Sequence, residues 1–151
     1  MSGQVQRLNS GNIFVVISSI VTAIGFMLPW ETTYYYGGFG IRSTGYAIAS
    51  GGLSKQYAHL HWAYYIPIAM ALVCGILSLV FINRHSPLSI LVVQLLLTVA
   101  GLLPFVLFFI EIKWLNQWRI TYTEPRFGLW ISVIGLIGIL FGLWKTKESG
   151  G

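Results

Sequence analysis

Charged side chains are scarce in this chain, and none lies within its four long apolar stretches. Only 9% of the 151 residues are charged and 56% are hydrophobic, whereas about 25% are charged in ordinary soluble domains. The stretches cover about 13–30, 62–82, 88–110 and 127–144, and a helix needs roughly 20 apolar residues to cross the hydrocarbon core of a bilayer. We therefore expect an all-α membrane protein, a four-transmembrane-helix bundle that forms a single integral membrane domain over 1–151.

Cysteine is nearly absent, and so are the sequence motifs of catalysis. The single cysteine, Cys74, cannot form an intramolecular disulfide, which excludes a thiol-redox enzyme built on paired cysteines. No serine nucleophile elbow, phosphate loop or HExxH helix occurs in the sequence. We therefore predict no catalytic residue and no cofactor, and we expect that the chain is not an enzyme.

A run of basic residues is also missing. The formal net charge is +5, but the nine Lys and Arg residues are scattered along the chain, so no continuous basic strip follows the phosphates of a nucleic acid. Cations that flank membrane spans account for the charge better. This distribution argues against a nucleic-acid partner.

The positions of the nine Lys and Arg residues indicate how the chain is oriented in the membrane, because four spans put both termini on the same side. The short inner segments then carry Arg7, Arg84, Lys145 and Lys147. The longer outer loops, 31–61 and 111–126, carry the other five cations at lower density. Cytoplasmic segments concentrate Lys and Arg, so we expect a multi-pass protein of the plasma membrane with both termini in the cytoplasm.

Aromatic residues lie almost entirely on the outer side. All eight tyrosines and five of the six tryptophans fall there, whereas interfacial aromatic belts normally occupy both membrane boundaries. The bias predicts an outer aromatic cap, and two interpretations of it stay open: a thick belt over a packed loop core, or a docking surface. The cap comprises Trp30, Tyr34, Tyr36, Trp62, Trp114 and Trp118.

The outer loops contain strand signals. Residues 31–36 and 39–46 are rich in β-prone types and are joined by Gly37-Gly38, which is a typical two-residue hairpin turn. Residues 118–123 are β-prone as well. Because an isolated two-stranded hairpin is only marginally stable, we expect 118–123 to add a third strand and to complete a small extracytoplasmic β-sheet cap.

Small residues mark a packing face on the last span. Gly128, Gly135 and Gly142 recur at heptad spacing, and Gly138 lies four residues before Gly142. Helices in lipid associate where small residues let their backbones approach. We therefore predict that these glycines form a helix-packing or partner face.

Gln94 is the most polar side chain within a span. Polar residues in a membrane are costly and raise a functional hypothesis. With Thr98, Ser18 and Thr22, it could line a narrow hydrated path; the alternative that we favour is an interhelical hydrogen bond.

Two histidines and a glutamate are candidates for a metal or proton-relay site. His59 and His61 precede the second span and Glu111 follows the third, so all three should lie at the same outer level. Two imidazoles and a carboxylate can hold a metal ion. Histidines at a membrane boundary also commonly lie among lipid headgroups, and we predict no metal.

The chain resembles a loose group of uncharacterised small prokaryotic four-span membrane proteins. The shared marks are Leu28-Pro29-Trp30 at the end of the first span, the Gly-rich stretch 37–45 and Gly128-Leu129-Trp130. The plan is also similar to that of claudins and peripheral myelin proteins, four helices under an extracellular sheet. The claudin signature of Gly-Leu-Trp with two cysteines in the first outer loop is missing, so the resemblance implies a fold and no junction-forming function.

These observations favour a non-catalytic membrane accessory or structural subunit. It would contact other membrane protein subunits, or a second copy of itself, through the glycine face and the aromatic cap. The alternative is a small oligomeric channel or transporter past Gln94, and the third hypothesis is a metal-dependent membrane enzyme at His59, His61 and Glu111. Apolar surfaces between the spans are compatible with bound lipid, and the sequence leaves quinone or pigment open.

Overall fold

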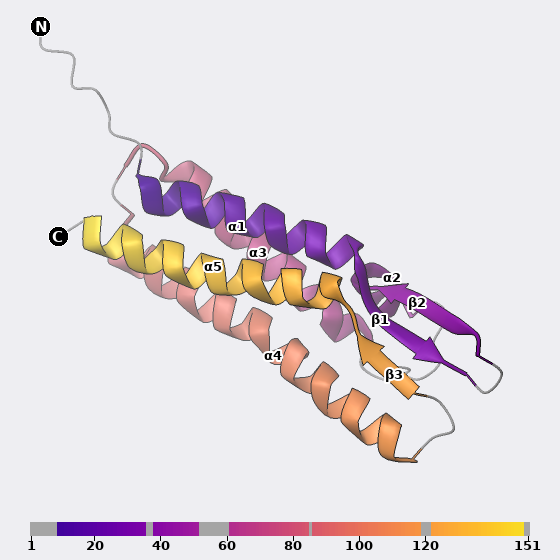
Figure 1. Ribbon diagram of the computed structural model, residues 1–151. Helices are drawn as coiled ribbons and strands as arrows, with labels where there is room; N and C mark the ends of the chain where they lie inside the picture. Colours follow the sequence, from indigo (N-terminus) through magenta and orange to yellow (C-terminus); the bar gives the residue numbers. More distant parts are fainter. Residues whose placement is uncertain (1–8, 36–37, 52–60, 85, 119–121, 150–151) are drawn as a thin grey trace, which may run out of the picture.

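Four long helices and a small sheet make up the fold. The computed structural model describes residues 9–35, 38–51, 61–84, 86–118 and 122–149. Its long helices are α1 (Ser10–Met27), α3 (Ile66–Val80), α4 (Leu88–Trp118) and α5 (Phe127–Ser149). The shorter elements are β1 (Pro29–Tyr34), β2 (Gly40–Thr44), α2 (Gly45–Ala49), the 3-10 helix η2 (His61–Tyr65) and β3 (Tyr122–Pro125). The start of α1 and the end of α5 lie at one end of the bundle, and the sheet lies at the other (Figure 1).

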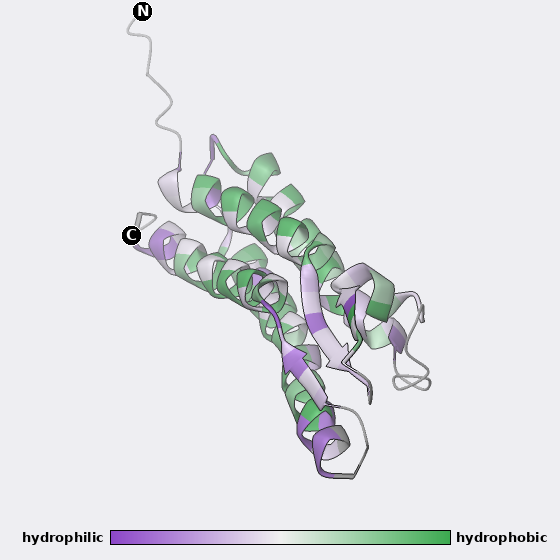
Figure 2. Ribbon diagram, turned by 45° about the vertical axis from the view of Figure 1, so that its right-hand side comes forward, coloured by the Kyte–Doolittle hydropathy of each residue, from purple (hydrophilic) through white to green (hydrophobic). Residues whose placement is uncertain are grey.

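The described residues include four helices that are long and apolar enough to cross a membrane. These segments are Ser10–Met27, His61–Val80, Leu88–Trp114 and Phe127–Glu148. Hydrophobic residues predominate along the long helices, whereas hydrophilic residues gather in the strands and at helix ends (Figure 2). The prediction of four apolar helices with a small sheet is thus confirmed.

The first long helix ends earlier than the predicted first span. The Asn9 side chain accepts a hydrogen bond from the Gly11 amide at 3.0 Å and caps the start of α1. At the other end Leu28 is extended, and Pro29 begins β1. A residue before proline is disfavoured in helical conformation, so Trp30, which we expected within the span, belongs to the sheet.

Helix α4 is longer than the predicted third span. Helix α4 continues past Pro104 and past residue 110 as far as Trp118. The second outer loop, expected over 111–126, is therefore helical for its first eight residues, 111–118. In Figure 1 this end of α4 reaches beyond the other long helices, towards the level of β3.

The predicted sheet has three antiparallel strands in the order β2-β1-β3. Thr32 of β1 lies opposite Arg42 of β2 and opposite Glu124 of β3. The third strand is present as expected, but it covers Tyr122–Pro125 rather than 118–123. Part of the predicted turn, Gly37, lies outside the described residues.

Trp30 joins the sheet to the bundle. Its side chain is fully buried, and its ring centroid lies 5.1 Å from that of Phe105 and 5.7 Å from that of Phe26. The indole Nε1 donates a hydrogen bond to the Gly25 carbonyl oxygen at 3.0 Å. A Cβ at Gly45 would lie 2.5 Å from this ring, so glycine there lets α2 close over the indole.

Candidate functional site

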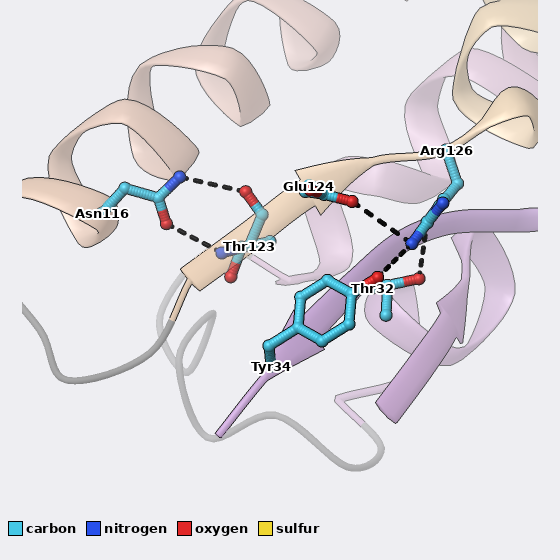
Figure 3. Close-up of polar contacts among 6 residues, drawn as sticks. All are labelled: Thr32, Tyr34, Asn116, Thr123, Glu124 and Arg126. Carbon is cyan, nitrogen blue, oxygen red and sulfur yellow. Dashed lines mark hydrogen bonds and ion pairs between the residues drawn. The ribbon is translucent and has the colours of Figure 1, made fainter. Parts of the chain in front are cut away.

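Arg126 connects three elements at the sheet end. It precedes α5, and its backbone amide donates to the Trp30 carbonyl oxygen at 2.7 Å. Its Nε donates to Thr32 Oγ1 at 2.8 Å, and its Nη2 donates to the Tyr34 hydroxyl (Figure 3). The same nitrogen lies 3.2 Å from Glu124 Oε2, in an ion pair whose side chains are about a third exposed. Exposed ion pairs contribute little stability, so we interpret Arg126 as a residue that positions β1 and β3 on the bundle.

Asn116 fastens the outer edge of the sheet to α4. Its side-chain nitrogen donates to the Thr123 carbonyl oxygen and its side-chain oxygen accepts from the Thr123 amide, each at 2.9 Å (Figure 3). The Asn116 side chain therefore pairs with the Thr123 backbone groups, which would otherwise be open to another strand at this edge of the sheet. This contact was not predicted, because Asn116 fell within a predicted loop.

The predicted aromatic cap divides into a buried part and an exposed part. Trp30 is fully buried and Tyr34 is half-buried, whereas Trp62 and Trp114 are exposed. Tyr36 and the side chain of Trp118 lie outside the described residues.

Six aromatic side chains at the sheet end, which we name the outer rim, are each more than half exposed. They are Phe39, Tyr46, Trp62, Trp114, Tyr122 and Phe127. Phe39 is the most exposed of them, at 79%. The exposure of Phe39 was not predicted, because an apolar residue in a strand pattern normally faces a core.

The metal-site candidates are only partly described. Glu111 Oε2 accepts a hydrogen bond from the Tyr64 hydroxyl at 2.6 Å. His61 begins η2, and its buried Nδ1 has no hydrogen-bond partner among the described residues. His59 lies outside them. The described part of the chain brings together no group of three His, Cys, Asp or Glu residues that could hold a metal, so the three-residue site stays a hypothesis without geometric support.

Gln94 and Thr98 lie between α3 and α4. The Gln94 side-chain nitrogen donates to the Cys74 carbonyl oxygen at 3.0 Å and to Ser78 Oγ at 2.9 Å. The Thr98 hydroxyl donates to the Gln94 carbonyl oxygen at 2.7 Å. Gln94 Oε1 is buried and has no hydrogen-bond partner within the described ranges. The contacts of the Gln94 nitrogen are interhelical, as the favoured interpretation expects.

Ser18 and Thr22 lie in a different interface, between α1 and α5. The Thr22 hydroxyl donates back to the Ser18 carbonyl oxygen at 2.9 Å. A Cβ at Gly135 would lie 2.3 Å from Thr22 Oγ1, and one at Gly138 would lie 2.5 Å from Ser18 Oγ. The structure therefore does not bring the four predicted path residues together, because two of them face α5 and two face α3.

The glycine face of α5 is covered by α1 and by the two residues that follow it, Leu28 and Pro29. A Cβ at Gly142 would lie 2.7 Å from a Val15 methyl group, and one at Gly128 would lie 2.6 Å from the Pro29 carbonyl oxygen. Gly135 and Gly138 meet Thr22 and Ser18, as described above. These glycines are thus in contact within the monomer, and the face is not exposed to a partner subunit.

Comparisons with family models, with curated proteins and with solved structures give no match to this chain. The resemblance to small prokaryotic four-span proteins and to the claudin plan therefore stays an expectation.

Proposed function

We propose that this chain is a multi-pass protein of the plasma membrane that serves as a non-catalytic accessory subunit and docks another membrane protein through its outer rim. Both termini would lie in the cytoplasm and the sheet would lie outside. Membrane lipid would surround the bundle, and the partner would contact the sheet end.

The outer surface of the helices supports the membrane location. Leu96, Leu103 and Ile134 are each about 60% exposed, and many other large apolar side chains on the four long helices are similarly exposed. Soluble monomers rarely expose contiguous apolar patches larger than a few hundred Å². Lipid tails are as apolar as these side chains, so contact with them carries no penalty in solvation free energy.

The outer rim is the observation that carries the docking proposal. Interface cores are enriched in aromatic residues, and a few such residues supply most of the binding energy. Phe39 argues against a simple interfacial belt, because belts use the polar tips of Trp and Tyr at the headgroup level. A 79% exposed phenylalanine beside a hairpin turn has no polar tip to place there.

The anchoring of the sheet also supports docking. Arg126 and Asn116 hold β3 to β1 and to α4, so the sheet, which carries Tyr122 and adjoins Phe39, is held in place before a partner binds. A preorganised surface loses less conformational entropy on binding. Because α1 and the two residues that follow it already cover the glycine face, the partner contact that we expected there is assigned to the rim.

The proposal is tested by the mass and composition of the particle that mild detergent extracts from native membranes. We expect the wild-type chain to copurify with a larger membrane subunit. The double variant Phe39→Ser, Trp114→Ser should lose at least about 1.4 kcal/mol of binding free energy, a tenfold weakening, and should run as a single chain.

The matched control is Trp144→Ser, since Trp144 is 55% exposed but lies near the end of α5, away from the sheet. This variant should retain the partner. A wild-type particle that contains this chain alone, or a rim variant that keeps its partner, would contradict the proposal.

A further inference from the structure

A groove lies between α4 and α5 at the end of the bundle where the termini lie. Its volume is about 240 Å³, and its apolar lining includes Leu88, Leu91, Leu95, Leu140 and Leu143. Trp144 and Lys147 also line it. The two helices run antiparallel, so Leu88 and Lys147 belong to the same end of the groove and Leu95 and Leu140 to the other.

The dimensions of the groove fit a hydrocarbon chain better than a helix. From Leu88 to Leu95 the axis of α4 rises about 10 Å, at 1.5 Å per residue. One leaflet of a hydrocarbon core about 30 Å thick is about 15 Å deep, so the groove covers most of that depth. A partner helix, about 10 Å wide with its side chains, would insert only a ridge of side chains into the groove, whereas an acyl chain can lie along its whole length.

The positive charge of Lys147 at one end of the groove favours a lipid with an anionic headgroup. Lys147 is exposed in the last turn of α5, at the end of the groove that opens beside the start of α4. Long basic side chains near helix ends extend to the headgroup level, and basic pockets between transmembrane helices on the cytoplasmic side bind anionic headgroups. An ammonium group above an apolar groove complements a phosphate above an acyl chain.

We propose that the α4–α5 groove binds an anionic phospholipid of the cytoplasmic leaflet, with one acyl chain along Leu91 and Leu143 and the headgroup phosphate at Lys147. This inference rests on the membrane location and orientation given under Proposed function. It adds a defined lipid site that does not depend on a partner subunit.

The test measures lipids that stay bound to the purified chain in native mass spectrometry. Phosphatidylglycerol and phosphatidylcholine with identical acyl chains are the probes. A juxtamembrane cation near an anionic lipid is worth about a fivefold preference, so the wild type should retain phosphatidylglycerol about fivefold better. Lys147→Gln should abolish this preference, whereas Lys145→Gln, which removes an equal charge outside the groove lining, should keep it.

A second variant tests the groove itself. Val92 lines the groove and is 46% exposed, so Val92→Phe fills the groove without altering a buried position. It should reduce retention of both lipids with an unchanged unfolding midpoint in detergent. Equal retention of the two lipids by the wild type, equal losses in Lys147→Gln and Lys145→Gln, or full retention by Val92→Phe would each overturn the lipid site. These readouts use the chain without a partner, so a failure here is distinguishable from a failure of the docking proposal.

Discussion

Replacing Gly135 by alanine should destabilise the protein by about 2–3 kcal/mol, although the change adds a single methyl group. A Cβ there would lie 2.3 Å from Thr22 Oγ1 and 2.7 Å from the Thr22 backbone nitrogen. The hydroxyl can rotate away, but the backbone nitrogen moves only if α1 separates from α5. Overpacking of this kind costs about 1–3 kcal/mol and occasionally more.

The sign of this effect distinguishes packing from helix propensity. Alanine is favoured over glycine inside a helix by about 1 kcal/mol. Replacing a glycine that has no close neighbours by alanine should therefore raise the stability of the protein. Gly101→Ala is the matched control, because its Cβ would lie 3.4 Å from Met70 Cβ, an ordinary contact distance. Unfolding in mixed micelles should give a lower free energy for Gly135→Ala and an unchanged or higher one for Gly101→Ala. Equal behaviour of the two variants would mean that α1 and α5 are not in close contact.

Replacing Trp30 by alanine should cost about 3–5 kcal/mol, the range for a large aromatic residue removed from a core. The side chain is fully buried between the sheet and the bundle and contacts the rings of Phe26, Phe105 and Phe108. Its removal leaves a cavity at the junction that holds β1 on the helices. We expect a large fall in the free energy of unfolding and earlier exchange of the sheet amides with deuterium.

Trp30→Phe separates the ring from its hydrogen bond. Phenylalanine fills much of the space but cannot donate to the Gly25 carbonyl oxygen. That oxygen also accepts from the Leu28 amide at 3.2 Å, so the loss should be about 1 kcal/mol. A loss as large as that of Trp30→Ala would show that the hydrogen bond, rather than the ring packing, holds the junction.

Much of the fold could be predicted from the distribution of charge and of turn residues. The absence of charge within four stretches predicts four apolar helices, because a charged side chain in lipid is costly. The hairpin followed from β-prone residues around a glycine pair, and the third strand followed from the marginal stability of two strands. The span ends were less predictable. Trp30 is apolar like the helix before it. The helix ends before Trp30 only because Pro29 disfavours a helical conformation at Leu28.

The arrangement of the candidate residues could not be predicted, because it depends on which helices are neighbours. A heptad of glycines identifies a face but not the helix that meets it. Ser18 and Gln94 are both polar residues within spans, yet one faces α5 and the other faces α3. In the same way, composition alone does not distinguish the buried Trp30 from the exposed Trp62.

The proposed topology, in which the chain crosses the plasma membrane four times with its sheet outside, can be tested by thiol labelling of intact cells. In a Cys74→Ala background, Phe39→Cys and Lys147→Cys each introduce a single exposed thiol at opposite ends of the molecule. A membrane-impermeant maleimide should label residue 39 in intact cells and residue 147 only after permeabilisation. Labelling of residue 147 in intact cells, or recovery of the chain in the soluble fraction, would rule out this topology.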